Sequence, residues 1–472
     1  MTRKRARKAA AANRLQVVSP IDGSIYAERE LATSAQLHRC LRTSREAARE
    51  WARTPVSERA RLCAKAARAL LPRRDEIALE ITYQMGRPLR DSMRELDGVL
   101  ERALYMTSIA ETALADIVPD PQPGFRRFIR REPLGVVLAI APWNYPYLTA
   151  INVLVPALTA GNSVILKHSP QTPLCAERLG EAMQTAGLPD GVFQFVHCDH
   201  AGIEELIRSD DGVDFVAFTG SVEGGHAIQS ALAPRFIGSG LELGGKDPAY
   251  VRADADPSAA ADGIVDGAIY NAGQSCCAVE RCYVHESVYD AFVREALERI
   301  GRYRLGDPRD LTTTLGPLVR AEAAARVRAR IDAAVRAGAR AHVPESSFPE
   351  SRPGTAYLAP QLLTEVDPSM ALMREETFGP VLCVARVRDD ADAIARMNDS
   401  RFGLTASIWT FDLEAAERIG QQLETGTVFM NRCDYLDPAL AWTGVKDSGR
   451  GCSLSRLGYE VLTRPKSFHL RF

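Results

Sequence analysis

Residues 133–225 constrain the fold most strongly, because short β-branched or aromatic runs alternate there with segments of helix length. The strand-like runs are residues 136–140, 163–166, 192–196 and 214–218. The segments between them are residues 148–158, 174–186 and 201–207. Strands that alternate with helices in this way usually form a parallel sheet with crossover helices. We therefore predict an α/β fold with a parallel sheet in this part of the chain.

Polar or glycine-containing loops follow three of these four runs. The residues that stand out in them are Pro142, Trp143 and Asn144 after the first run, Lys167, Ser169 and Pro170 after the second, and Gly220, Ser221 and Gly225 after the fourth. Ligands of open parallel sheets bind outside the carboxyl ends of the strands. We expect the three loops to converge on one rim of the sheet.

Each of these loops has a structural and a functional interpretation. Lys167 is either a solvated charge or a donor to ribose hydroxyls or a phosphate. Gly220 and Gly225 either end a strand and a helix or open a turn whose N–H groups bind a pyrophosphate. Asn144 either caps a turn or holds an oxyanion. A Gly-x-Gly-x-x-Gly fingerprint is absent here, so spacing alone does not establish dinucleotide binding.

A candidate nucleophile lies further along the chain, at Cys276 in the sequence Asn-Ala-Gly-Gln-Ser-Cys-Cys, residues 271–277. The loop precedes a strand-like run, and backbone N–H groups in such a loop can lower a thiol pKa and bind an oxyanion. The alternative is an inert packing cysteine. Glu242, flanked by leucines, is either part of a capped turn or a general base whose pKa is raised by desolvation.

Length and composition limit the class of protein. A chain of 472 residues exceeds one hydrophobic core, so two or three domains are expected. A formal net charge of −2 gives no footprint for nucleic acid, and no apolar run is long enough to span a membrane. The ten cysteines lack metal-ligand spacing and suggest neither a zinc site nor a disulfide scaffold, which favours a reducing cytoplasm. The basic start, residues 1–14, is expected to be a flexible tail.

Taken together, seven short motifs resemble those of the aldehyde dehydrogenase superfamily, in the family's order and over nearly the whole chain. They are residues 142–144, the Lys167 segment, residues 218–225, residues 242–246, residues 273–276, Glu-Thr-Phe-Gly-Pro at 376–380 and Gly-Val-Lys-Asp-Ser-Gly at 444–449. Each motif is short, but a joint chance match is very unlikely.

The resemblance implies an α/β fold with two parallel-sheet domains and a small β oligomerisation element. Residues 15–114 and 134–244 would form the cofactor-binding domain, and residues 245–447 the catalytic domain. Residues 115–133 and 460–472 would form an oligomerisation arm, in which a predicted strand at 462–470 takes part. The family assembles through such an arm, so a homodimer or homotetramer is expected.

The resemblance also implies a mechanism. Cys276 would attack the aldehyde carbon, while the Asn144 side chain and the Cys276 N–H hold the oxyanion of the thiohemiacetal. Hydride would pass to the nicotinamide and leave a thioester. Glu242 would then activate the water that releases the carboxylic acid. Cys277 is expected to be a packing neighbour.

For the cofactor, the resemblance implies contacts from both halves of the chain. Lys167, with Ser169 and Pro170, would lie at the adenosine ribose, Ser221 with Gly220 and Gly225 at the pyrophosphate, Glu376 at the nicotinamide ribose and Phe378 beside the ring. Pro142, Trp143, Leu243 and Gly244 would shape the same site.

Three positions depart from the family pattern. Many members that prefer NAD have a glutamate where this chain has Pro170, so the cofactor is NAD or NADP. A lysine and a second glutamate of many members align with Val153 and Ser453. If those two groups normally relay the proton taken by the base, Glu242 must lose it by water or another route.

The segment around Lys167 and His168 is similar to bacterial succinate-semialdehyde dehydrogenases, which suggests a semialdehyde substrate. Near the expected substrate entrance, Arg432 would favour an anionic substrate and Asp434 an amino-aldehyde, unless the two pair with each other. Two further activities stay open: a CoA-acylating dehydrogenase, which Glu242 argues against, and a cofactor-independent thiol esterase acting through Cys276. A non-catalytic scaffold is disfavoured by the intact motif residues.

Overall fold

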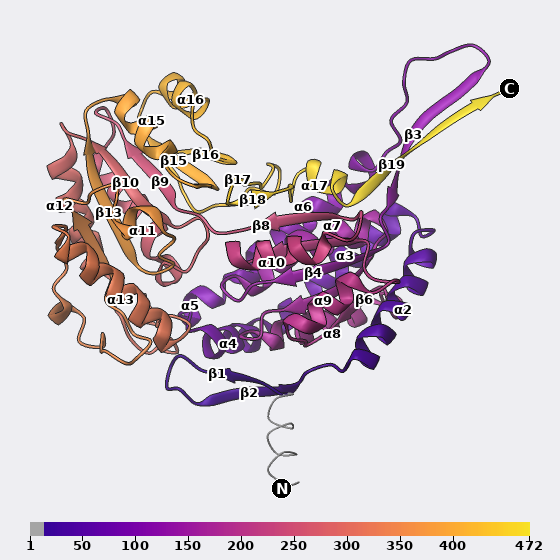
Figure 1. The fold of residues 1–472 in the computed structure, drawn as a ribbon, viewed down its shortest axis with the longest axis horizontal. Coiled ribbons are helices and arrows are strands. Elements are labelled where there is room, and N and C mark those ends of the chain that lie inside the picture. Colours follow the sequence, from indigo (N-terminus) through magenta and orange to yellow (C-terminus); the bar gives the residue numbers. More distant parts are fainter. Residues whose placement is uncertain (1–13) are drawn as a thin grey trace, which may run out of the picture.

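A computed structural model describes residues 14–472 of the chain (Figure 1). The predicted basic tail lies outside the described residues except for Arg14, which begins a strand rather than ending a tail. That strand, β1 (Arg14–Val18), forms an antiparallel hairpin with β2 (Ile25–Glu30). Within the described range, none of the helices combines the length and the apolar character needed to cross a membrane.

A six-stranded sheet occupies the part of the chain where alternation predicted one. In spatial order its strands are β18 (Gly449–Arg450), β8 (Gly238–Glu242), β7 (Phe215–Thr219), β4 (Val136–Ala141), β5 (Ser163–His168) and β6 (Phe193–Phe195). All neighbours are parallel except β18 with β8. The central strands β4 and β5 are buried along their whole length, which explains their continuous apolar sequence. The four predicted strands are confirmed.

Helices cover this sheet and connect its strands, as predicted. The crossover helices are α7 (Pro146–Ala160), α8 (Pro173–Ala186), α9 (His200–Arg208) and α10 (Val222–Leu232). The N-terminal helices are α2 (Ser34–Trp51), α3 (Val56–Ala69), α4 (Arg74–Met85), α5 (Leu89–Ser92) and α6 (Glu95–Ala113). Gly161, with a φ of 103°, ends α7 in the left-handed conformation that glycine adopts at little cost.

A seven-stranded sheet forms the second α/β unit, on the left of Figure 1. In spatial order its strands are β11 (Arg340–Ala341), β12 (Gln361–Thr364), β13 (Val381–Val387), β10 (Val279–His285), β9 (Asp247–Val251), β15 (Thr405–Trp409) and β16 (Thr427–Met430). Only β11 is antiparallel to its neighbour. The helices of this unit are α11 (Pro257–Ile269), α12 (Tyr289–Ile300), α13 (Ala321–Arg336), α14 (Ala371–Arg374), α15 (Asp390–Asn398) and α16 (Leu413–Gly420). With the six-stranded sheet, it confirms the predicted α/β class with two parallel-sheet units.

The C-terminal strand, β19 (Thr463–Arg471), pairs antiparallel with β3 (Phe125–Pro133) over nine residues. Figure 1 shows the two strands extending away from both sheets as a separate ribbon. Phe128 and Phe468 face each other across the pair, with ring centroids 4.5 Å apart. We call β3 and β19 the arm. The chain also forms a short antiparallel pair, β14 (Phe402–Gly403) with β17 (Val445–Lys446), and helix α17 (Leu457–Glu460) precedes β19.

Candidate active site

Four parallel strands end at the same edge of the six-stranded sheet. Ile140 of β4 is in register with Lys167 of β5 and with Phe218 of β7, and Thr219 of β7 is in register with Glu242 of β8. The polar loops that follow these strands therefore share one rim, as the sequence predicted. Glu242, the last residue of β8, joins them there.

Cys276 lies in a tightly held turn that comes to this rim from the second sheet. Asn271 and Ala272 adopt positive φ angles of 53° and 56°, which reverse the chain after α11. The buried side chain of Gln274 fixes the turn: its amide donates to Asn271 O at 3.1 Å and accepts from Val319 N at 2.8 Å. The thiol that follows is only partly buried.

Gly245, two residues before β9, contacts the backbone of Cys276. A Cβ placed on it would lie 2.1 Å from the Cys276 carbonyl oxygen, far inside van der Waals distance. Only glycine lets the two backbone segments approach this closely. The connection from Glu242 to β9 thus sets the position of the Cys276 backbone.

The side-chain amide of Asn144 lies against the turn that precedes Cys276. Its Nδ2 donates to Gln274 O at 3.1 Å, and the side chain is 5% exposed. In the described part of the chain, the second N–H of this amide and the backbone N–H of Cys276 have no acceptor. Two fixed donors near one thiol are what an oxyanion requires.

Arg87 holds these loops together, although the sequence offered no signal for it beyond a Gly-Arg-Pro break. Its guanidinium is buried and pairs with Glu95 of α6. It also donates to Asn271 Oδ1 at 3.1 Å and to the backbone oxygen of Asn144. Glu95 in turn accepts from the Tyr147 N–H at 2.8 Å, at the start of α7.

Glu242 lies in a desolvated position with two hydroxyl partners. Its carboxylate accepts hydrogen bonds from Ser453 Oγ at 2.5 Å and from Thr219 Oγ1 at 3.1 Å. Burial raises the pKa of Glu242, and the two hydroxyl donors partly oppose that shift. Ser453 therefore contacts the expected base directly.

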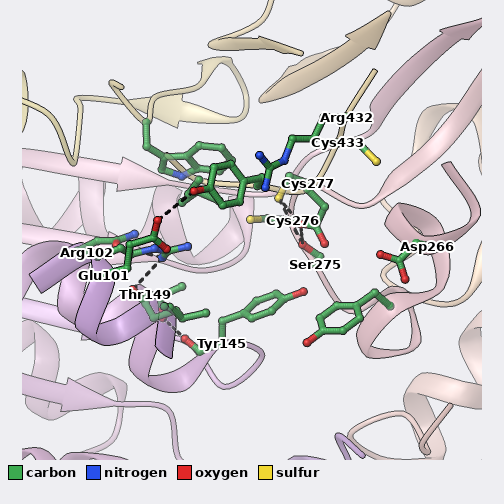
Figure 2. Close-up of a pocket in the computed structure, with 18 of the residues that line it drawn as sticks. Glu101, Arg102, Tyr145, Thr149, Asp266, Ser275, Cys276, Cys277, Arg432 and Cys433 are labelled. Carbon is green, nitrogen blue, oxygen red and sulfur yellow. Dashed lines mark hydrogen bonds between the residues drawn. The ribbon is translucent and has the colours of Figure 1, made fainter. Parts of the chain in front are cut away.

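Two cavities meet at Cys276. One has a volume of about 560 Å³ and opens toward α6, α11 and the segment around Arg432; the other has a volume of about 320 Å³ and lies over the rim of the six-stranded sheet. Cys276, Glu242, Thr149 and Thr219 line both. We call them the outer cavity and the rim cavity. Figure 2 shows the outer cavity, with Cys276 at its centre.

Most of the predicted binding residues lie around the rim cavity. Besides Asn144 these are Pro142, Trp143, Gly220, Ser221, Leu243, Gly244, Glu376 and Phe378. Trp143 and Phe378 contact edge to face, with centroids 5.6 Å apart. Glu376 accepts from Gly245 N at 3.1 Å, and burial, with the nearby Glu280, raises its pKa to about 7.

Four predicted binding residues, Lys167, Ser169, Pro170 and Gly225, line neither cavity. Lys167 lies one strand further along the rim, buried near Cys198 and Asp199. Its amine has no hydrogen bond or ion pair within residues 14–472, and burial lowers its pKa. Gly225 packs against Leu243, where a Cβ would come within 2.8 Å of the leucine methyls.

The residues around the rim cavity suit a dinucleotide. Ser221 caps α10 through its hydroxyl, which accepts from Gly224 N at 3.1 Å. The N–H groups of Val222 and Glu223 have no acceptor among the described residues, and free N–H groups at a helix start favour a phosphate. The Glu376 carboxylate at the other end can accept from sugar hydroxyls.

The other nine cysteines all have raised pKa values, and seven of them are buried. Burial raises the pKa of eight of them, which are Cys40, Cys63, Cys175, Cys198, Cys282, Cys383, Cys433 and Cys452. The pKa of Cys277 is raised by hydrogen bonding with Cys276 and by burial. Its thiol donates to Asp434 Oδ1 at 2.9 Å, which fits the expected packing role.

The suggested pairing of Arg432 with Asp434 is wrong. Asp434 accepts from Ser275 Oγ at 3.1 Å as well as from Cys277, and burial raises its pKa. Arg432 instead lies over the ring of Tyr435, with Cζ 3.4 Å from the centroid. A buried arginine of α6, Arg102, also lines the outer cavity, and the sequence had not marked it.

Comparison with known proteins gives consistent results. The family model described as the aldehyde dehydrogenase family matches residues 7–468. Betaine aldehyde dehydrogenase 2 of Rhizobium meliloti is 36% identical, over 95% of this chain and 92% of that protein. The NADP(+) succinate-semialdehyde dehydrogenase of Deinococcus radiodurans is 35% identical, over 95% and 93%. A solved indole-3-acetaldehyde dehydrogenase with NAD+ superposes with a TM-score of 0.92 at 31% identity, covering 98% of this chain and 94% of that one.

Proposed function

Because the chain belongs to the aldehyde dehydrogenase family, we propose that it oxidises an aldehyde to a carboxylic acid with NAD or NADP. The observation that carries this proposal is that Cys276 and Glu242 line both cavities. An aldehyde in the outer cavity and a nicotinamide in the rim cavity would meet at the same sulfur. The tight turn at Cys276 and its contact with Gly245 keep that meeting point fixed.

In the first step the Cys276 thiol loses its proton to solvent, and the thiolate sulfur attacks the aldehyde carbon to form a thiohemiacetal oxyanion. The negative charge develops on the former carbonyl oxygen, where the Asn144 amide and the Cys276 N–H would stabilise it. Both donors are held before substrate arrives, so no reorganisation is needed during attack. Arg87 supports this by holding the backbone oxygen of Asn144.

When bound, the nicotinamide supplies the hydride acceptor that turns the thiohemiacetal into a thioester on Cys276. Glu376 would hold the nicotinamide ribose, and Phe378 with Trp143 would flank the ring. Ser221 and the free N–H groups at the start of α10 would hold the pyrophosphate, and Lys167 with Ser169 the adenosine ribose. Pro170 leaves no carboxylate there to repel a 2′-phosphate, so NADP would be tolerated at this position as well as NAD.

Glu242 takes a proton from the water that attacks the thioester, which releases the acid and regenerates the thiol. The raised pKa of Glu242 suits a base that works near neutral pH. Desolvation makes its carboxylate a stronger base than a carboxylate in water. The hydroxyls of Ser453 and Thr219 would hold the carboxylate between successive turnovers. A base that takes a proton from water favours hydrolysis of the thioester over transfer of the acyl group to CoA.

The test is steady-state reduction of NAD and of NADP over a panel of aliphatic, aromatic, anionic and cationic aldehydes. Cys276→Ala should abolish reduction, while Glu242→Gln should keep a single-turnover burst of reduced cofactor and slow later turnovers by about 10²- to 10⁴-fold. Cofactor-independent ester hydrolysis without any aldehyde oxidation would favour the thiol esterase. Turnover that requires CoA would favour the acylating enzyme.

We further propose that residues 15–114 and 134–244 act as the cofactor-binding domain and residues 245–447 as the catalytic domain. The arm, with residues 115–133 and 460–472, would join copies of the chain into a homodimer or homotetramer. Its support is an antiparallel pair that extends away from the two sheets and therefore has faces open to a second chain.

A further inference from the structure

Arg102 of α6 is a buried positive charge at the wall of the outer cavity. The side chain is 9% exposed, and it has no carboxylate within ion-pair distance in the described part of the chain. Its Nη1 donates to Leu148 O at 3.2 Å and to Asn152 Oδ1 at 3.1 Å. Its Nε and Nη2 have no acceptor among residues 14–472.

Two further donors of the same wall also lack an acceptor among the described residues. These are the Nδ2 of Asn152 and the hydroxyl of Tyr145, both buried. Leaving a buried donor unpaired costs free energy, and leaving a buried charge unpaired costs more. A wall that holds a guanidinium and two unpaired donors suits an anionic ligand with several oxygens.

None of the acidic groups that line the outer cavity forms an ion pair with Arg102 among the described residues, although the charges of Glu242 and Glu101 act on it at longer range. Glu101 accepts from the Tyr435 hydroxyl at 3.1 Å, and Asp434 is held by Ser275 and Cys277. Asp266 lies on the opposite side of the cavity from Arg102 (Figure 2). Arg432, the other labelled arginine, lies against the Tyr435 ring.

We propose that Arg102 binds a carboxylate at the far end of the substrate, so that the enzyme prefers short aldehydes that carry a terminal carboxylate. Arg102 would donate hydrogen bonds from Nε and Nη2 to the two carboxylate oxygens, in the paired geometry that guanidinium groups offer. The carbonyl carbon of the same molecule would then reach Cys276 in the centre of the cavity. This inference rests on the proposed aldehyde oxidation and specifies its substrate class.

The test compares small aldehydes that differ in charge. 4-Oxobutanoate carries the carboxylate, its methyl ester lacks the charge, and betaine aldehyde carries the opposite charge. The wild-type enzyme should give a kcat/KM for 4-oxobutanoate at least about 30-fold above that for the ester, since a buried charge pair is at stake. Betaine aldehyde should be the poorest of the three.

Variants of Arg102 then test whether this residue causes the preference for the aldehyde that carries a carboxylate. Arg102→Met keeps the apolar stem and should lower kcat/KM for 4-oxobutanoate by about 100-fold, mainly through KM, while the ester changes by less than about threefold. Arg102→Lys should restore part of the loss, because it returns the charge without the paired geometry. Arg432→Met is the matched control from the same cavity and should leave the ratio of the two substrates within about threefold.

The outcomes separate this inference from the proposed function. Equal rates for 4-oxobutanoate and its ester in the wild type would overturn the role of Arg102 but leave aldehyde oxidation intact. Equal losses for both substrates in Arg102→Met and Arg102→Lys would mean a structural role only. If Arg432→Met, rather than Arg102→Met, lowers kcat/KM for 4-oxobutanoate, the carboxylate does not bind at Arg102. No oxidation of any aldehyde would overturn both.

Discussion

The environment of Glu242 balances two opposing effects on one carboxyl group. Burial raises its pKa, because a desolvated carboxylate is less stable than in water. Hydrogen bonds from Ser453 and Thr219 stabilise the charged form and lower the pKa again. If Glu242 is the base, as we propose, these two hydroxyls help to set the pH at which it works.

Ser453→Ala tests that balance. Losing the donor removes stabilisation of the carboxylate, so the pKa of Glu242 rises further. A base acts only when deprotonated, so the acidic limb of the kcat–pH profile should move to higher pH. Thr219→Val should move it in the same direction. The assignment fails if the profiles of both variants coincide with the wild type or move to lower pH.

The sequence marks candidate residues that have local signals, but it does not reveal contacts between residues that lie far apart in the chain. Cys276 is marked by its glycine-containing loop, and Glu242 by its apolar neighbours. The hydrogen bond between Glu242 and Ser453 joins residues 211 positions apart, and nothing near Ser453 indicates it. Arg102 likewise looks like any polar residue of a helix until its burial and missing partner are seen.

The loops of the site depend on close contacts between elements. Gly245 lies between β8 and β9, and its missing side chain makes room for the carbonyl oxygen of Cys276. Gly245 leads into β9 and Cys276 into β10, its neighbour in the seven-stranded sheet, so a small displacement at this contact would move the sulfur relative to the Asn144 amide. Displacements of about 1 Å in an active site can cost about 100-fold in rate.

Gly245→Ala should therefore lower kcat/KM by about 100-fold, measured with the best aldehyde, while the protein remains folded by circular dichroism. Gly301→Ala, just after α12, is the matched control. A Cβ there meets nothing closer than 3.5 Å, so its activity should stay within about twofold of the wild type. Unchanged activity in Gly245→Ala would show that the backbone contact does not determine the position of the Cys276 thiol.

The Arg87–Glu95 pair joins α6, α7 and the two loops at Asn144 and Asn271. Arg87→Met would leave Glu95 buried without its partner, which should lower the free energy of unfolding by about 3–5 kcal/mol in urea titration. Arg53→Met breaks an exposed pair with Glu50 and should cost about 0–1 kcal/mol. Similar small losses in both variants would argue against the structural role.

Strands and crossover helices could be predicted because hydrophobic runs and their spacing are local properties. The elements observed from β4 to β7 follow the predicted ranges within a few residues. How the Arg87 segment reaches Asn144 depends on tertiary packing instead, and the Met-Gly-Arg-Pro sequence only indicates a helix break. The same holds for the outer cavity, whose wall combines α6, α7 and the loop after β16.

Assembly concerns the whole molecule. Deleting residues 464–472 removes the partner of β3 without touching either cavity. If the arm joins the subunits, the full-length chain should have at least twice the mass of 51.6 kDa in light scattering, and the deletion variant should approach one chain. A deletion variant that keeps the full-length mass would place the interface elsewhere.

The different environments of the ten cysteines allow the active sites of this protein to be titrated with a thiol reagent. At neutral pH the nine others stay largely as unreactive thiols, because their pKa values are raised. A limiting amount of an alkylating reagent should then add one label per competent chain, at Cys276, and activity should fall in proportion to the mass gained. Counting labels by mass spectrometry would give the concentration of working sites in any preparation.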